Sequence, residues 1–166
     1  MNATIIHQPA LRLITAKSKS FPEGNSEAMS SIESHLESLG GRKFYGLAYE
    51  SEEGMDYYAG LVPSNEAEER RFAELGFPII EVDGGACARV KLLDWSSKID
   101  QIGPTFGAMI REHGIDTLRP QMEFYRSMRE LQLLLPVPLD SRRQGKPTTA
   151  KDVADQRTAR HDSKFP

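Results

Sequence analysis

The order of apolar patterns along the chain repeats, and this repeat constrains the fold more than any other feature of the sequence. The patterns predict a strand, a helix and two strands, and then the same four elements again. Two such modules joined edge to edge make one antiparallel sheet. We therefore expect an α+β fold of duplicated strand-helix-strand-strand modules, with two helices on one face of the sheet and a ligand groove on the other.

The first module begins with an apolar, β-branched stretch at residues 4–16, interrupted by Pro9. A proline inside such a run predicts either one strand with a bulge or two short strands. A helix follows, with Asn25 or Ser26 as its cap and Gly40 as its stop. Its buried face is predicted from the spacing of four apolar residues, Met29, Ile32, Leu36 and Leu39.

Two strands at residues 43–50 and 55–62 complete this module, joined by the polar link 51–54, which is typical of a hairpin. A charged connection at residues 63–74 comes next, with at most a helical turn. Its charged residues fit a solvated face, and we assign it no function.

The second module is predicted from residues 86–137. A strand at residues 86–95 follows the Gly84-Gly85 turn, and Ser96 or Ser97 can cap a helix that ends at Gly114. Pro104 then kinks this helix or begins its longer part. The apolar face of the helix has the same spacing as in the first module: Ile99, Ile102, Phe106 and Met109.

A closing hairpin is predicted from the apolar runs at residues 122–125 and 131–137. Side chains alternate along a strand, so Glu123 and Tyr125 share one face while Met122 and Phe124 share the other. Pro136 indicates that the second strand is an edge strand or ends there.

Glu123 is the most informative residue of this hairpin. An ionised carboxylate costs several kcal/mol to bury without a partner, so a buried Glu123 should be hydrogen-bonded, raised in pKa, or ready to meet a cation. The alternation alone fits equally well with a glutamate on the solvent face of an antiparallel hairpin.

Length and composition indicate one domain of residues 1–137, followed by a polar, basic tail, 138–166, that we expect to be disordered. The single cysteine, Cys87, excludes an intrachain disulfide and a cysteine-rich metal site. The four histidines lack ligand spacing. We expect neither a metal nor a cofactor.

The chain shows neither a secretory signal pattern nor an apolar run long enough to span a bilayer, so we expect a cytoplasmic protein without membrane contact. The tail has seven Lys/Arg against four Asp/Glu, and the rest of the chain is acidic. An acidic body disfavours direct nucleic-acid binding and mildly favours cationic partners.

The segment at residues 119–125, RPQMEFY, resembles a basic-Pro-x-apolar-Glu-x-Tyr stretch of the GyrI-like small-molecule-binding domain. This family also supplies the effector-binding half of multidrug-responsive regulators of the AraC and MerR types. The closing segment 130–137 ends in Pro-Val, as is typical of the family. Cys87 departs from the pattern, because relatives usually have a tyrosine there. The resemblance covers most of residues 4–137.

The resemblance implies a groove between two modules, where the glutamate matching Glu123 meets cationic aromatic ligands. Such a groove offers a carboxylate and aromatic faces for cation–π contacts. The candidate ligand-binding residues are Glu123, Tyr125, Tyr45, Tyr49, Tyr57 and Trp95. Each of these aromatic residues could instead belong to the core. Alternation does not decide whether Tyr57 or Tyr58 faces the groove.

Three functions follow from the resemblance. The first is stand-alone binding of a hydrophobic, cationic aromatic small molecule. The second is hydrolysis of cyclopropane-bearing DNA-alkylating compounds, a detoxification with Glu123 and Tyr125 as the catalytic residues. The third is a gyrase-inhibitor-like interaction protein. Because binding a cation and activating a water both require a buried acid, the sequence alone does not separate the first two.

Overall fold

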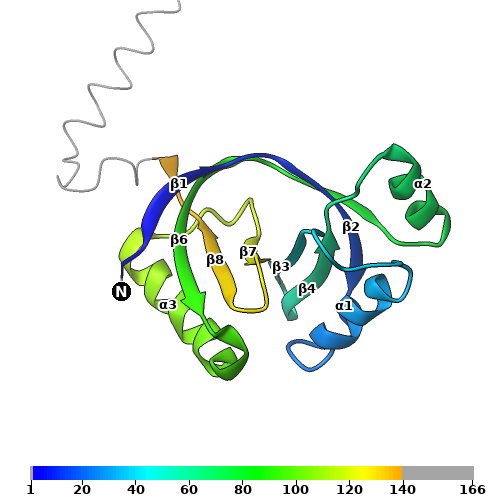
Figure 1. Cartoon of the computed structure of the whole chain (residues 1–166). Helices are drawn as coiled ribbons and strands as arrows, with labels where there is room; N and C mark the ends of the chain where they lie inside the picture. The colour runs from blue at the N-terminus through cyan, green and yellow to red at the C-terminus, as the bar shows by residue number, and fades with distance from the viewer. Residues whose placement is uncertain (1, 140–166) are drawn as a thin grey trace, which may run out of the picture.

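The computed structural model describes residues 2–139, which form one curled, eight-stranded antiparallel sheet with three α-helices (Figure 1). The strands are β1 (Thr4–Gln8), β2 (Leu11–Lys17), β3 (Phe44–Ser51), β4 (Gly54–Leu61), β5 (Ile79–Val82), β6 (Gly85–Leu93), β7 (Gln121–Tyr125) and β8 (Glu130–Pro136). The helices are α1 (Asn25–Glu33), α2 (Glu66–Glu74) and α3 (Ile102–His113), and two short 3-10 helices, η1 (Trp95–Ser97) and η2 (Ile99–Gln101), precede α3.

The predicted α+β fold with an antiparallel sheet is confirmed, and the strand order shows how the two halves join. The order is β1-β6-β8-β7-β3-β4-β2-β5. The apolar stretch predicted at residues 4–16 is divided near Pro9 into β1, which pairs with β6, and β2, which pairs with β4 and β5. The first strand region therefore contributes to both halves, and its two strands arch over the molecule together with β5 and β6 (Figure 1).

Helices α1 and α3 pack on one face of the sheet, as predicted. Glu123 lies opposite Leu133 on β8 and opposite Gly46 on β3, and Gly46 lies opposite Ala59 on β4. Paired residues in a sheet point to the same face. Leu133 packs with α3 and Ala59 packs with α1, so this face carries both helices. Glu123 therefore lies on the helix face, between α1 and α3, whereas we expected the groove on the opposite face.

Helix α1 differs from the prediction at both ends. Gly24, rather than Asn25 or Ser26, is the N-cap, and no side chain caps the helix. The helix ends at Glu33, before Leu36 and Leu39 of the predicted apolar face. The hydroxyls of Ser31 and Ser34 donate hydrogen bonds to preceding backbone carbonyls, and the chain then tightens into turns. Serine side chains compete in this way with helical hydrogen bonding.

Helix α3 also begins later than predicted. Its N-cap is Gln101, because Ser96 and Ser97 belong to the 3-10 helix η1. Pro104 lies in the first turn of α3, where its missing N–H removes no helical hydrogen bond, and Gly114 ends the helix with a φ of 73°. Phe106 and Met109 are buried on α3, as predicted, and His113 is buried with them. Ile99 does not belong to this face, because it lies in η2 and is 60% exposed.

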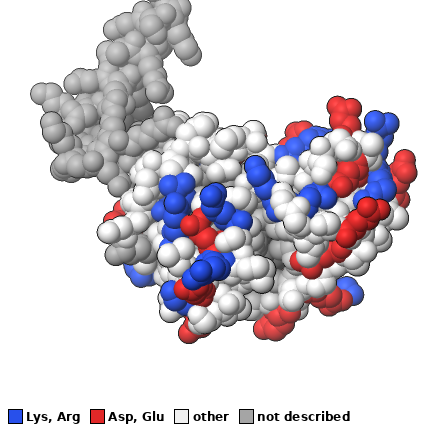
Figure 2. All heavy atoms as spheres, in the orientation of Figure 1, with Lys and Arg blue, Asp and Glu red and all other residues white. Residues whose placement is uncertain are grey.

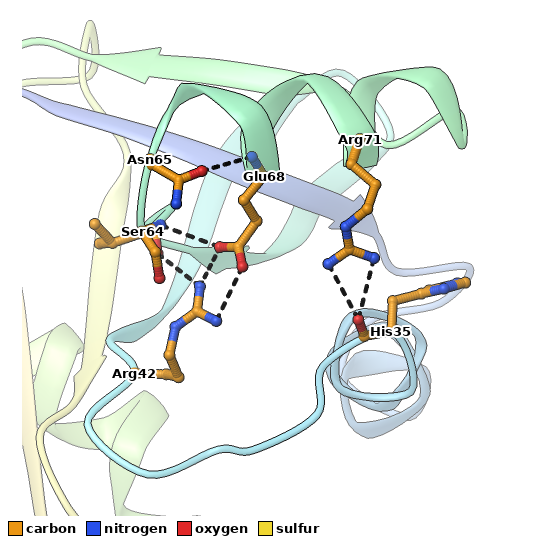
Figure 3. A network of polar contacts seen from close by, with 7 residues as sticks. His35, Arg42, Ser64, Asn65, Glu68 and Arg71 are labelled. Atoms are coloured by element: carbon orange, nitrogen blue, oxygen red, sulfur yellow. Dashed lines mark hydrogen bonds and ion pairs between the residues drawn. The ribbon is translucent and has the colours of Figure 1, made fainter.

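The charged connection forms a complete helix, α2, where we expected at most a turn. Asn65 caps it by accepting a hydrogen bond from the backbone N–H of Glu68, and Phe72 buries its side chain completely. Figure 3 shows that Arg42, from the loop before β3, makes a two-pronged ion pair with Glu68. Arg71 donates two hydrogen bonds to the backbone carbonyl of His35. These contacts fasten the loop between α1 and β3 to α2.

The closing hairpin forms as predicted, from β7 and β8. Strand β8 lies between β6 and β7, so Pro136 ends an inner strand rather than marking an edge. Val137 donates a backbone hydrogen bond to Ala86, which ties the end of the hairpin to β6. Apart from residues 138 and 139, the predicted tail lies outside the described residues. No helix of residues 2–139 is long and apolar enough to cross a membrane.

Candidate functional site

Glu123 lies near the middle of the sheet, on the inner strand β7. It is partly buried, between the two regions where α1 and α3 cover the same face. The space-filling view shows a furrow between the half that carries α3 and the half that carries α1 (Figure 2). Among the described residues, no Lys or Arg forms an ion pair with this carboxylate. Glu123 is thus a partly buried acid that has no cationic partner within residues 2–139.

A chain of hydroxyl groups leads to the carboxylate. The hydroxyl of Tyr125 donates a hydrogen bond of 2.9 Å to Oε2 of Glu123. The hydroxyl of Tyr57, from β4, lies 3.4 Å from that of Tyr125. A tyrosine has a single hydroxyl hydrogen, and that of Tyr125 is directed to the carboxylate. Tyr57 therefore donates to Tyr125, and the two hydroxyls point in sequence toward Glu123.

Two further aromatic rings lie next to the pair of tyrosines, one beside Tyr125 and one beside Tyr57. The ring of Trp95 meets that of Tyr125 edge to face, with centroids 5.3 Å apart. The indole N–H of Trp95 donates to the backbone carbonyl of Ser127, which holds the ring in place. On the other side, Phe21 lies 6.0 Å from the ring of Tyr57, and 45% of Phe21 is exposed. Trp95 and Phe21 therefore flank the two tyrosines whose hydroxyls lead to the carboxylate.

Burial dominates the electrostatics of this group. It raises the pKa of Glu123, and the hydrogen bond from Tyr125 offsets only part of that rise. Burial also raises the pKa of Tyr57 and of Tyr125, and the nearby carboxylate raises both further. The two hydroxyls therefore remain protonated at neutral pH and act as hydrogen-bond donors, and the carboxylate can be stabilised further by a cation.

The structure brings together some of the predicted site residues and separates others. Tyr57, Tyr125 and Trp95 lie with Glu123 on the helix face. Tyr45 and Tyr49 point to the opposite face, where Tyr45 stacks on Phe124 with centroids 4.7 Å apart and Tyr49 belongs to the same apolar cluster. Their strand directs Gly46 toward Glu123, so the residues on either side of Gly46 must point away.

Two residues of this site were not predicted. Phe21 lies in a turn, where no periodic pattern indicates which way a side chain points. Gly46 lies inside a strand, and a glycine there can indicate a close approach of another group. A Cβ atom at Gly46 would meet the hydroxyl of Tyr57. The glycine within the predicted strand was therefore the one sequence feature of β3 that could have indicated a close contact at this site.

Cys87, where the resemblance to the GyrI-like domain led us to expect a tyrosine, lies apart from the aromatic rings near Glu123. Its side chain is completely buried and lies opposite Ile6, which belongs to the apolar cluster of Tyr45. The guanidinium of Arg119 lies 3.9 Å from its sulfur and is also held by Asp116. Burial raises the pKa of the Cys87 thiol, which keeps it protonated. Cys87 therefore contributes to packing near the start of β7.

Within residues 2–139, no group of three or more metal-ligating side chains is suitably placed to hold a metal ion. The Tyr125 hydroxyl donates to the Glu123 carboxylate, and the Tyr57 hydroxyl contacts that of Tyr125. The arrangement suits recognition of an organic cation, or activation of a water molecule, by a carboxylate and hydroxyl groups.

Comparison with known proteins relates the chain to a set of solved structures. No family model and no curated protein sequence matches it. The structure of SAV2435 bound to tetraphenylphosphonium superposes with a TM-score of 0.61 and 13% identity, covering 87% of this chain and 98% of that one. The EcmrR C-terminal domain gives a TM-score of 0.55 and 10% identity, covering 82% of this chain and 97% of the domain. A hydrolase from Listeria innocua gives 0.53 and 15%, covering 82% and 92%. At these identities the likeness shows that the chain shares their fold.

Proposed function

We propose that this protein binds hydrophobic, cationic aromatic small molecules beside Glu123. The observation that carries this proposal is a partly buried carboxylate that has aromatic neighbours and hydroxyl donors but no cationic partner among the described residues. A cationic ligand would supply the missing charge, and its rings would pack against the aromatic side chains.

The energetics favour such a ligand over a neutral one. Each cation–π contact with a tyrosine or tryptophan face contributes about 0.5–2 kcal/mol. Oε2 of Glu123 accepts the hydrogen bond from Tyr125, and no hydrogen bond from the described residues reaches Oε1. Oε1 therefore remains available to a ligand. SAV2435, which shares the fold, has been seen with tetraphenylphosphonium, a cation that carries four phenyl groups, and this supports the choice of ligand class.

The distribution of charge along the chain adds a longer-range attraction. Residues 2–83 contain seven Lys/Arg and fourteen Asp/Glu, whereas residues 84–137 are nearly balanced, with seven and six. The acidic excess of the body thus belongs to the half that carries α1 and α2, and acidic side chains are prominent over that half in Figure 2. Such a field raises the local concentration of cations near the furrow.

The experiment is calorimetric binding of tetraphenylphosphonium to the wild-type protein and to Glu123→Gln. Triphenylphosphine oxide serves as a neutral aromatic analogue. Loss of the carboxylate charge should weaken binding of the cation by about 2–5 kcal/mol and leave the neutral analogue nearly unaffected. Glu53→Gln, in the exposed turn before β4, is the matched control because it removes the same charge far from the rings. Equal affinities of wild type and Glu123→Gln for the cation would refute the proposal.

A second candidate function is hydrolysis of cyclopropane-bearing alkylating compounds, and the hydroxyl chain is the observation that favours it. Glu123 with a raised pKa can act as a base toward water, and Tyr125 can donate a proton to a leaving group. The test is incubation with such compounds, followed by mass spectrometry of the products. A catalytic role predicts turnover that falls about 10²–10⁴-fold in Tyr125→Phe. Stoichiometric binding without any product would argue against hydrolysis and leave binding as the remaining function.

A further inference from the structure

Gly46 is the direct cross-strand partner of Glu123, and the space beside it is occupied by Tyr57. A Cβ atom at residue 46 would lie 2.1 Å from the hydroxyl oxygen of Tyr57, 2.7 Å from its Cζ and 2.9 Å from its Cε2. All three distances are too short for non-bonded atoms. The phenol end of Tyr57 therefore fills the volume that any side chain at position 46 would need.

The path of the Tyr57 side chain explains this contact. Tyr57 lies opposite Ala48, so its ring must lean along β3 and pass over Gly46 before its hydroxyl can reach Tyr125 on β7. Only 2% of Tyr57 is exposed, so the ring is enclosed on its other sides. A side chain at position 46 would therefore force the hydroxyl away from Tyr125.

The requirement at Gly46 is one of space and not of backbone conformation. Five glycines of residues 2–139 have a positive φ, and Gly46 is not among them. Gly60, on the neighbouring strand β4, offers a comparison. A Cβ atom there would meet the flexible tip of Leu13 at 3.1 Å, on the opposite face of the sheet. Gly60→Ala is thus a matched strand substitution that does not touch Tyr57.

We propose that Gly46 is a positioning residue of the binding site: it admits the Tyr57 phenol, which orients the Tyr125 hydroxyl toward Oε2 of Glu123 and leaves Oε1 for the cation. The inference rests on the proposed binding function for its effect on ligands, while the placement of Tyr57 can be tested without any ligand. A side chain at position 46 breaks the hydroxyl chain and lowers the preference for cations over neutral aromatic molecules.

The ligand-free test is ultraviolet titration of tyrosine ionisation in wild type, Gly46→Ala and Gly60→Ala. In the wild type, Tyr57 is buried beside a carboxylate and resists ionisation. In Gly46→Ala the displaced Tyr57 should move away from the carboxylate and titrate closer to the ordinary tyrosine pKa of about 10. Gly60→Ala should keep the wild-type curve. An unchanged curve in a folded Gly46→Ala protein would overturn the proposal.

The ligand test compares the affinity ratio of tetraphenylphosphonium to triphenylphosphine oxide. Gly46→Ala should lower this ratio about two- to tenfold, because the hydrogen bond between the uncharged hydroxyls of Tyr57 and Tyr125 is lost. The same substitution should have no further effect in a Tyr57→Leu background, because leucine lacks all three atoms that collide with the Cβ atom. Additive effects of Gly46→Ala and Tyr57→Leu on this ratio would contradict the positioning role. An equal loss of affinity for both ligands in Gly46→Ala would also contradict it.

Two outcomes are separated by this design. If the wild-type protein binds neither compound, the proposed function fails, and the tyrosine titration still decides whether Gly46 positions Tyr57. If Gly46→Ala alone does not fold, the double variant with Tyr57→Leu should restore folding, because the collision has been removed. Failure of the double variant to fold, when Tyr57→Leu itself folds, would overturn the proposal.

Discussion

Tyr125 and Glu123 lie two residues apart on the same face of β7, and the tyrosine hydroxyl donates a 2.9 Å hydrogen bond to the glutamate carboxylate. The two side chains are held by one strand, so their geometry depends little on loop movements. This bond does not offset the burial of the carboxylate, because the net effect on the pKa of Glu123 is still a rise. The fold therefore carries a carboxylate whose charge is destabilising, and the cation that we propose as ligand would compensate it.

The first prediction concerns the stability of Glu123→Gln. A carboxyl group with a raised folded-state pKa binds more protons when folded than when unfolded, so the wild type loses stability as pH rises from the ordinary glutamate pKa of about 4.3 through the folded-state pKa. Glutamine has no charge to bury. Thermal unfolding should therefore show a higher melting temperature for Glu123→Gln at pH 8, by about 2–4 °C per kcal/mol relieved, and little difference at pH 4.

The control for this prediction is Glu53→Gln, since Glu53 is exposed in the turn before β4. Its melting temperature should follow the wild type at both pH values. A Glu123→Gln protein that is less stable than wild type at pH 8 would show that the charged carboxylate contributes favourably to the fold, contrary to the electrostatics described above.

The second prediction uses Trp95, the single tryptophan of the chain, as a reporter. Its ring meets Tyr125 edge to face beside the carboxylate, so a ligand bound there should change its fluorescence. Saturable quenching by tetraphenylphosphonium is expected, with the same dissociation constant as in calorimetry. Trp95→Phe should largely keep affinity, and Trp95→Leu should lose about 0.5–2 kcal/mol through the missing aromatic face. Unaltered emission at saturation would place the ligand elsewhere.

The third prediction follows from the two faces of the sheet. Tyr45 and Tyr49 point away from Glu123, so Tyr45→Phe and Tyr49→Phe should leave the affinity for tetraphenylphosphonium within about twofold of wild type, the usual range for a site that shares no partners. Tyr57→Phe loses a hydroxyl of the chain to Glu123 and should weaken binding by about 0.5–1.5 kcal/mol. A large effect at Tyr45 or Tyr49 would move the site to the other face.

Much of the fold was predictable, because its strands carry clear alternation and its helices carry an apolar face. The duplicated order led to the correct class and to the closing hairpin of β7 and β8. Pairing between distant strands was not predictable in the same way. Nothing local in residues 4–16 shows that β1 joins the half with α3 while β2 joins the half with α1. Such a division depends on pairing with strands that lie far away in the sequence.

The relative positions of site residues were predictable where those residues belong to the same strand. Alternation along β7 correctly places Glu123 beside Tyr125, and apolar Met122 on the other face. Whether Tyr57 or Tyr58 joins them depends on the register between β3, β4 and β7, which spans three separate segments. The face of Tyr45 depends on the same register. The C-terminal end of α1 was predicted too late in the chain, because the hydroxyls of Ser31 and Ser34 donate to preceding backbone carbonyls and compete with a longer helix.

The fourth prediction concerns the ion pair between Arg42 and Glu68, which fastens the loop after α1 to α2 (Figure 3). Both side chains are only 15% exposed, so removing one leaves the other poorly solvated. Arg42→Ala should lower the free energy of unfolding at pH 7 by about 1–3 kcal/mol, measured by urea denaturation. Arg12→Ala is the control, because the Arg12 side chain is 52% exposed and water screens its ion pairs, so its loss should lower the free energy of unfolding much less.

The pH dependence of this pair should run opposite to that of Glu123. Burial alone would raise the pKa of Glu68, but hydrogen bonds from Arg42 and from the backbone of Ser64 hold it below the ordinary value. The stabilisation is therefore complete above the unfolded-state pKa of about 4.3 and is lost as pH falls through the lower folded-state pKa. The difference between wild type and Arg42→Ala should accordingly shrink in acid. A difference that stays constant down to acid pH would mean that Arg42 acts through its packing and its hydrogen bond to the carbonyl of Val62 rather than through the charge of Glu68.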